Sequence, residues 1–331
     1  MALNVGIIGL KGHQGTITNG MKLIPDARMA AVCDDDQSKL AGVPNYPGAD
    51  GGTLTFTDPI KMLDEVELDI VGVCGTDAER APVIIEAARR GLHVLAEKPL
   101  AMTLQELKQV TSAVAAGGIH LSMLLTMRFE PAYLTMRRMI AEGAVGEVCL
   151  ATMQKSYRLG DRPAWQRNRK TFSGIIPFIG IHALDLIRWT TGREFVRGAA
   201  YCANTGHPEM GELEDNASVA LQLDNGGSAS ARLDYCRPAA APTHGDDRLR
   251  VAGNAGVIES AQHGERVLYI HPEDGETELP LDAKRDQFAD FVGSIRGENA
   301  SWVPAEDCYR MTEVTLKLRD VANTDRTADL R

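Results

Sequence analysis

His93-Val94-Leu95-Ala96-Glu97-Lys98-Pro99-Leu100 joins an apolar run to a charged pair and a proline. The apolar part has the length expected for a buried strand. The charged pair and the proline then end that strand, because proline has no amide hydrogen to donate to a neighbouring strand. At the carboxyl end of a parallel strand, Glu97 and Lys98 would point into the crevice where such folds bind ligands. A solvated strand end is the more common explanation of an isolated Glu-Lys pair, so the surrounding sequence decides between the two.

Composition and charge exclude several classes of protein. The chain has 331 residues, of which 44% are hydrophobic and 24% charged, and this length predicts about two globular domains. The formal net charge is -10 and no block of Lys or Arg is present, which argues against nucleic acid or an anionic membrane as partner. The six cysteines include no C-x-x-C pair, as expected for buried thiols in a reducing compartment. We find no signal peptide or bilayer-spanning run, so we expect a cytoplasmic protein.

A glycine-rich loop follows the first apolar run, which covers residues 3–8. The loop reads Gly9-Leu10-Lys11-Gly12-His13-Gln14-Gly15, and apolar residues recur at helical spacing after it. In this order of strand, loop and helix, a G-x-G-x-x-G pattern indicates dinucleotide binding, because glycines let the backbone approach a pyrophosphate. The match is imperfect. Without gaps, Lys11 replaces the second glycine; with one inserted residue, which we prefer, Gly12 and Gly15 keep the pattern. An ordinary turn between a strand and a helix is the alternative.

The apolar run at residues 29–33 ends in Asp34-Asp35-Asp36. Asp34 lies about twenty residues beyond the glycine loop, where a carboxylate can accept hydrogen bonds from an adenosine ribose. The same carboxylate would repel a 2′-phosphate, and no arginine follows closely, so NAD is favoured over NADP. An aspartate run also suits a helix cap, and both roles are compatible because one aspartate suffices for the ribose.

Two domains are predicted from the order of the patterns. Strands alternate with helices through residue 125, which predicts a Rossmann-type doubly wound parallel sheet over residues 1–125. Short alternating strands then dominate, and Asp224-Asn225-Gly226-Gly227 is typical of a tight hairpin turn. We therefore expect a second α/β domain over residues 126–331, with an open, mostly antiparallel sheet and a terminal helix able to pack back on the first domain. An open sheet face is a natural surface for a homodimer or homotetramer.

One apolar helix pattern, residues 180–189, carries His182 and Asp185. These two residues are three positions apart and share a helix face. A lone histidine in such a helix is more often a core residue, but a carboxylate on the same face can fix its tautomer and raise its basicity. One histidine and one aspartate do not make a metal site, so no metal is expected.

With these residues identified, the chain resembles the glucose-fructose oxidoreductase/inositol dehydrogenase/MocA (Gfo/Idh/MocA) family over nearly its whole length. The Glu97-Lys98-Pro99 run in its strand context is the most specific part of the resemblance. The family implies a Rossmann domain and a second α/β domain commonly used for oligomerisation. It also implies NAD(P)-dependent hydride transfer on a sugar, cyclitol or related polyol. The segments that carry the resemblance are residues 5–9, 31–34, 91–100, 143–148, 180–185 and 249–253.

The resemblance also assigns site residues. Lys98 falls on the family's catalytic lysine and His182 on its active-site histidine, while Glu97 would lie near the nicotinamide ribose. From their places in the sequence, and not from the resemblance, we expect substrate contacts at Asp185, Tyr157, Arg162 and Trp165. The cofactor contacts that we expect are Gly9, Lys11, Gly12, His13, Asp34, Thr76, Glu97 and Lys98.

Two departures from the family pattern leave the function open. Phe178 stands where the family often has an aspartate, four residues before the histidine, that binds substrate hydroxyls and transfers a proton. Arg80 stands near the usual place of another histidine. Tyr157 is a candidate replacement acid, although a structural tyrosine is the more common case. The leading hypothesis is oxidation of a secondary alcohol of a sugar, cyclitol or sugar acid. The alternatives are a catalytically weakened dinucleotide-binding sensor and an NAD-dependent glycoside-cleaving enzyme.

Overall fold

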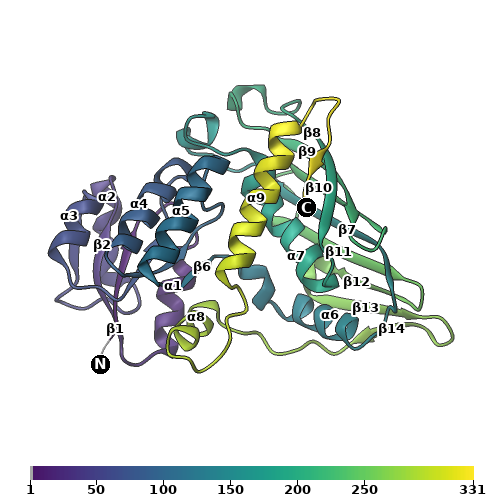
Figure 1. The fold of residues 1–331 in the computed structure, drawn as a ribbon, viewed down its shortest axis with the longest axis horizontal. Coiled ribbons are helices and arrows are strands. Elements are labelled where there is room, and N and C mark those ends of the chain that lie inside the picture. Colours follow the sequence, from purple (N-terminus) through teal and green to yellow (C-terminus); the bar gives the residue numbers. More distant parts are fainter. Residues whose placement is uncertain (1–2) are drawn as a thin grey trace. The chain divides into compact units, whose positions relative to one another are not determined.

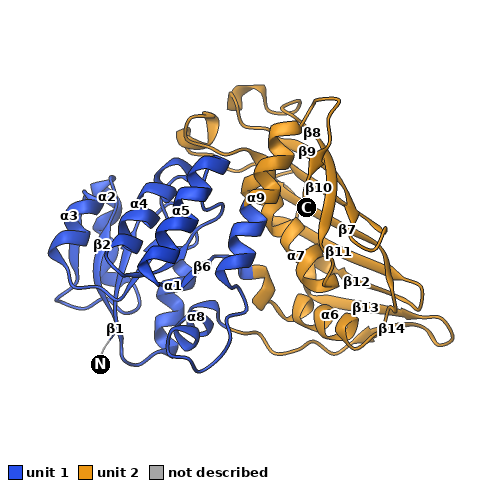
Figure 2. Cartoon of the chain, viewed as in Figure 1, with its two compact units in different colours: residues 1–126, 286–312 blue, residues 127–285, 313–331 orange. Residues whose placement is uncertain are grey.

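The computed structural model describes residues 3–331 and divides them into two compact units (Figure 2). Unit 1 combines the chain up to residue 126 with residues 286–312, and unit 2 combines residues 127–285 with residues 313–331. The predicted second domain included residues 286–312, which the structure groups with unit 1.

Unit 1 contains a six-stranded sheet in which every pair of neighbouring strands is parallel. The order β3-β2-β1-β4-β5-β6 is that of a Rossmann fold, with its topological switch point between β1 and β4. The predicted doubly wound sheet is therefore confirmed. Its strands (Figure 1) are β1 (Leu3–Ile8), β2 (Ala27–Cys33), β3 (Leu54–Phe56), β4 (Ile70–Val73), β5 (His93–Ala96) and β6 (Leu121–Met123).

The helices of unit 1 include one from far along the chain. A Cβ atom on Gly20 would lie 2.5 Å from Cβ of Phe288, so this glycine allows α1 and α8 to approach closely. Phe288 and Phe291 join Val5 and Ile17 in the buried core beside β1. The helices are α1 (Gln14–Gly20), α2 (Gln37–Leu40), α3 (Pro59–Glu65), α4 (Asp77–Arg89), α5 (Leu104–Gly117) and α8 (Gln287–Ile295).

Unit 2 contains a nine-stranded sheet ordered β14-β13-β12-β11-β7-β10-β9-β8-β15. Among the described strands, β7 and β10 form its one parallel pair, so the sheet is mostly antiparallel as predicted. The predicted turn at residues 224–227 joins β9 to β10, with Gly226 at φ 87°. The strands are β7 (Val148–Arg158), β8 (Phe195–Ala203), β9 (Asn216–Leu223), β10 (Ser228–Arg237), β11 (Gly245–Gly253), β12 (Val257–Ala261), β13 (Arg266–His271), β14 (Gly275–Leu279) and β15 (Ala328–Asp329).

One face of this second sheet is covered and the other is open to solvent. Burial alternates along β9 and β10, as expected when one side chain in two faces a core. The helices α6 (Pro131–Ala141) and α7 (Ile181–Thr191) lie against the sheet (Figure 1). The helix α9 (Ala305–Val321) belongs to unit 2 from residue 313 onward. No helix in the described part of the chain is long and apolar enough to cross a membrane.

We expect Phe288→Ala to lower the free energy of unfolding of unit 1 by about 3–5 kcal/mol, because it removes a fully buried ring from the core beside β1. Urea unfolding followed by circular dichroism measures this change. The control is Leu23→Ala, whose side chain is exposed, with an expected change of at most about 0.5 kcal/mol. A loss at Phe288 no larger than at Leu23 would contradict the assignment of α8 to this core.

Candidate active site

Two glycines shape the loop that follows β1. Gly9 has φ 88°, and a Cβ atom on it would overlap the backbone of Gly75 in the loop after β4. A Cβ atom on Gly12 would overlap the carboxylate of Glu97. The loop thus has no space for side chains at Gly9 and Gly12, and we call it the glycine cradle. A pyrophosphate-binding turn requires glycines at such positions so that the backbone can approach the phosphates. Gly15 is the third glycine of the preferred alignment, and a Cβ atom on it would have its nearest neighbour at 3.9 Å, so glycine is not required sterically there.

Glu97 ties this loop to the end of β5. Its side chain is 2% exposed, and Oε1 accepts a hydrogen bond from the backbone N–H of His13 and lies 2.7 Å from His13 Nδ1. Burial on its own would raise the pKa of Glu97, but the charge and hydrogen bond of His13, followed by the charges of Lys98 and Arg80, lower it well below its usual range. Glu97 is therefore a buried anion that holds the glycine loop.

Lys98 follows directly and is buried. Its backbone is held by Arg80 of α4, whose Nη1 donates to the carbonyl oxygens of Lys98, at 2.5 Å, and Pro99, at 3.1 Å. Arg80 is itself buried and pairs with Asp77 at 2.8 Å. Arg80, which stands near the place of a family histidine, therefore fixes the backbone of the candidate catalytic lysine.

A cleft of about 390 Å³ in unit 1 is lined by the loops that follow β1, β2 and β4. The carboxylate of Asp34 is 0% exposed there, because Oδ2 accepts from Leu10 N at 2.6 Å and Oδ1 accepts from Asp36 N at 2.9 Å. Asp35 is 67% exposed and pairs with Lys11 at 2.8 Å. The carboxylate open to a ligand is thus that of Asp35, which sequence spacing did not select.

The remaining predicted cofactor contacts belong to the same edge of the sheet. Lys11 lies 3.4 Å from Glu79, whose Oε2 accepts from Thr76 N at 2.8 Å. All of the predicted cofactor residues follow the carboxyl ends of β1, β2, β4 or β5, which is where open α/β sheets bind ligands. They are Gly9, Lys11, Gly12, His13, Asp34, Thr76, Glu97 and Lys98.

In unit 2, His182 is the second residue of α7 and follows the π-helical turn Ile176–Gly180. Such turns within helices occur frequently at functional sites. The histidine is buried, as is Asp185 one turn later. Arg128 binds Asp185 with two hydrogen bonds, Nε to Oδ2 at 2.9 Å and Nη2 to Oδ1 at 2.5 Å. Asp185 therefore anchors α7 to Arg128, which disfavours the predicted contact with substrate.

Phe178 lies in that π-helical turn and completes a cluster of three aromatic rings. Its ring centroid is 5.1 Å from Phe172 and 5.9 Å from Trp165, with edge-to-face geometry in both pairs. From residue 172 to 187, Phe178 is the one residue that is not fully buried. An apolar ring thus replaces the family's acid, and Trp165 contributes to the same surface.

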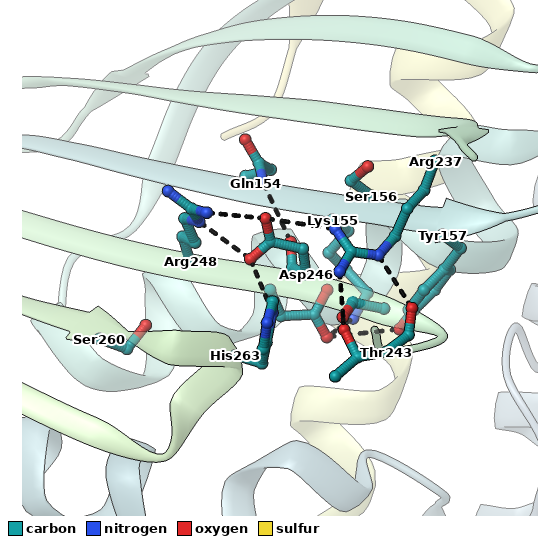
Figure 3. A network of polar contacts seen from close by, with 12 residues as sticks. Gln154, Lys155, Ser156, Tyr157, Arg237, Thr243, Asp246, Arg248, Ser260 and His263 are labelled. Atoms are coloured by element: carbon teal, nitrogen blue, oxygen red, sulfur yellow. Dashed lines mark hydrogen bonds and ion pairs between the residues drawn. The ribbon is translucent and has the colours of Figure 1, made fainter. Parts of the chain in front are cut away.

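A buried ionic cluster lies on the covered face of the second sheet (Figure 3). Lys155 is 0% exposed, with Nζ 2.8 Å from Asp247 and 4.9 Å from the ring centroid of Tyr157. The Tyr157 hydroxyl lies 3.4 Å from Asp247. Burial raises the pKa of Tyr157, Lys155 opposes that shift and Asp247 adds to it. A raised pKa disfavours proton donation near neutral pH, so these contacts favour a structural role for Tyr157.

Several residues of these sites were not among the predicted set. Lys155 lies on the same face of β7 as the buried Ala151 and Met153. A lysine at a core-facing position of an alternating strand could have indicated a buried ion pair. Arg128 lies between the apolar residues Met127 and Phe129, and a charged residue between two apolar ones could likewise have indicated a buried ion pair. The role of Arg80 depends on contacts with residues 18 and 19 positions away, and the local sequence carries no signal for it.

No group of three or more His, Cys, Asp or Glu side chains within residues 3–331 is arranged to hold a metal ion.

The glycine cradle on a parallel sheet, followed by an open mixed sheet, defines a dinucleotide-binding protein of two units. Residues 3–124 match the oxidoreductase family with an NAD-binding Rossmann fold, and residues 133–259 match the GFO/IDH/MocA C-terminal domain. The chain belongs to the Gfo/Idh/MocA family of oxidoreductases.

Named relatives and a solved structure agree with this family. Inositol 2-dehydrogenase 2 of Saccharopolyspora erythraea is 30% identical over 68% of this chain. The matched part covers 65% of that relative's own length, just under two thirds. Myo-inositol 2-dehydrogenase of Thermotoga maritima is 23% identical over 92% of each chain. A solved structure from Thermotoga maritima, described as that of an oxidoreductase, is 32% identical and covers 98% of this chain and 99% of that one, with a TM-score of 0.92.

We expect Glu97→Gln to be less stable than the wild type near neutral pH, with a difference that shrinks in acid. The folded-state pKa of Glu97 lies below its ordinary value, which is about 4.3. The ionised carboxylate therefore stabilises the fold fully above about pH 4.3, and this contribution is lost as the pH falls towards the folded-state pKa. Urea unfolding of both proteins across this pH range measures the difference. A difference that does not change with pH would contradict the buried-anion assignment.

Proposed function

We propose that this protein is an NAD-dependent dehydrogenase that transfers a hydride between nicotinamide and a secondary alcohol of a sugar, cyclitol or sugar acid. The observation that carries the proposal is the buried Lys98 at the end of β5, on the same sheet edge as the glycine cradle. The inositol dehydrogenases among the relatives support the substrate class.

In this proposal Lys98 and His182, which the family resemblance matches to a catalytic lysine and an active-site histidine, are each candidates to hold and move the proton of the substrate hydroxyl. When bound, the nicotinamide ring supplies the acceptor or donor of the hydride. Arg80 fixes the backbone of Lys98, and the pair of Arg128 with Asp185 fixes the helix that carries His182. Because these contacts hold Lys98 and His182 in place, the two side chains need to move little when the proton is transferred.

Asp35 supports NAD rather than NADP as the cofactor. Its carboxylate is open at the cleft, where it would accept hydrogen bonds from ribose hydroxyls and repel a 2′-phosphate. The hydrogen bond from Lys11 lowers the pKa of Asp35, against the opposing effect of burial, so the group is an anion at neutral pH.

Phe178 favours a second candidate function, a sensor that binds NAD without turnover. A phenylalanine can neither bind a substrate hydroxyl nor transfer a proton, so loss of the family's acid would be consistent with lost catalysis. The buried Lys98 and the supported His182 favour the enzyme. A protein that binds NAD and oxidises no member of a polyol and sugar-acid panel would be the sensor.

We also propose that the open face of the second sheet mediates assembly of a cytoplasmic homodimer or homotetramer. Leu150 of β7 and Tyr201 of β8 are large side chains exposed on this sheet. Burial of such groups against a second copy would contribute to association.

Replacing Lys98 by Ala is expected to lower NADH formation at least about 100-fold with any substrate that the wild type oxidises, because it removes a proton-transfer group. NAD binding by the folded variant, measured by calorimetry, is expected to weaken far less than turnover, because Lys98 also contributes to the charge balance of Glu97. Lys108→Ala, at an exposed position of α5, is the control and is expected to keep full activity. Turnover by Lys98→Ala at the wild-type rate would refute the catalytic assignment.

Asp35→Asn is expected to weaken NAD binding about tenfold, because a hydrogen bond to a charged group contributes about 1.5–3 kcal/mol. The ratio of NAD to NADP affinity is expected to fall in the same variant, because the repulsion of the 2′-phosphate is removed. Asp34→Asn is expected to lower mainly the stability of unit 1, since Asp34 binds backbone amides. Unchanged NAD affinity in Asp35→Asn would show that another group holds the ribose.

A further inference from the structure

Two arginines at the end of β7 have no anionic partner. Arg158 is the last residue of β7, and Arg162 lies in the loop after it. Both are partly buried, and the Nε–H group of each is buried without a hydrogen-bond partner. Within residues 3–331, no carboxylate forms an ion pair with either guanidinium. A partly buried cation without a partner is costly, because it loses hydration without gaining an ion pair.

Two carboxylates on β11, the strand that pairs with β7, already have cationic or hydroxyl partners. Asp246 lies among Arg248, Arg237 and His263 (Figure 3). Asp247 pairs with Lys155. None of these acids is therefore left to neutralise Arg158 and Arg162.

Other arginines of the same loop differ in this respect. Arg167 lies 3.9 Å from Asp161, and Arg169 forms an ion pair with Glu214. Among the four arginines at the end of β7 and in the loop after it, Arg158 and Arg162 are thus the two without an ion pair.

A tyrosine ring packs on Arg162, and the backbone N–H of Arg158 donates to the carbonyl oxygen of His244. The Arg162 guanidinium lies 4.2 Å from the ring centroid of Tyr235, and its Nη2 donates to the carbonyl oxygen of Arg158 at 3.3 Å. His244 stacks on Tyr157, with ring centroids 5.3 Å apart. Burial, followed by the charges of Arg162 and Arg158, lowers the pKa of His244. The two guanidiniums therefore add to burial in disfavouring the protonated form of His244.

The same loop and strand reach the helix of His182 inside unit 2. Trp165, three residues after Arg162, contacts the ring of Phe178, four residues before His182. On β10, the residue two positions before Tyr235 is Leu233, whose Cδ1 packs against Gly180. Residues two apart on a strand face the same side about 7 Å from each other. The arginine pair thus lies a few side chains from the start of α7.

We propose that Arg158 and Arg162 form a subsite for an oxyanion group of the substrate, so that the protein acts on an acidic sugar derivative. The planar guanidinium matches both carboxylate and phosphate through paired N–H donors. The group would be the carboxylate of a sugar acid or the phosphate of a sugar phosphate. Trp165 and Phe178 would contact the apolar face of the same sugar ring. This inference rests on the proposed dehydrogenase function for the identity of the rest of the ligand.

The test is anion binding to the full-length protein without turnover. Inorganic phosphate and acetate are titrated at constant ionic strength, and tryptophan fluorescence and calorimetry report binding. Neutral glycerol is titrated as the reference. Wild type, Arg162→Gln and Arg158→Gln are compared with Arg197→Gln, an exposed arginine on β8 three strands from β7. Circular dichroism and the midpoint of thermal unfolding show whether each variant is folded.

Saturable millimolar binding of at least one anion to wild type is expected. Folded Arg162→Gln or Arg158→Gln is expected to bind that anion at least tenfold more weakly, with Arg197→Gln unchanged. Binding of acetate assigns a carboxylate, and binding of phosphate alone assigns a phosphate ester. Equal binding by wild type and both folded variants, or no saturable binding by wild type, overturns the subsite. If both of those variants fail to fold, Arg162→Lys is tested in their place. Binding of the anion by Arg162→Lys with the same affinity as wild type would overturn the proposal that paired guanidinium donors hold the anion. Because no hydride is transferred, failure of the dehydrogenase function alone leaves these binding results unaffected.

Discussion

A single buried carboxylate, Glu97, sets the geometry of the nucleotide-binding half of this protein. It joins the end of β5 to the loop after β1, and the absence of a side chain on Gly12 makes room for it. Its charge is stabilised by His13, Lys98 and Arg80 despite burial. A buried anion with this many partners resists displacement, since removal of one partner leaves an uncompensated charge. Arg80 extends the same arrangement by fixing the backbone of Lys98 and Pro99.

The second unit also holds buried charges in close ion pairs, but two of its arginines lack such a pair. Arg128 with Asp185 and Lys155 with Asp247 are buried or nearly buried charges in close pairs. These pairs hold α7 and the covered face of the sheet. Arg158 and Arg162 are partly buried and have no such partner within residues 3–331. Because a partly buried cation without an ion pair is costly, an anion from outside would complete this site.

Much of the fold could be predicted from the sequence because it depends on local periodicity. Alternating strands and helices identified the parallel sheet, and the alternation of apolar and polar residues with an Asn225-Gly226 turn identified the second sheet. A stripe such as Phe288 and Phe291 shows that a helix is buried but not against which core. The sequence therefore predicted a terminal helix able to pack back on the first domain, but not that the segment grouped with unit 1 is residues 286–312. Spacing identified an aspartate at the end of β2, but which of Asp34 and Asp35 stays open depends on amides brought there by the fold. Whether the predicted catalytic and substrate residues act as proposed stays a prediction.

Calorimetric titration of NAD into wild type and Glu97→Gln tests most directly whether this carboxylate organises the cofactor site. The variant keeps the shape of the side chain and loses its charge. About tenfold weaker NAD binding is expected, because a charged hydrogen bond to the glycine loop is replaced by a neutral one. The exposed Glu67→Gln is expected to bind NAD as wild type does. Equal NAD affinity in wild type and a folded Glu97→Gln would contradict the central role of Glu97.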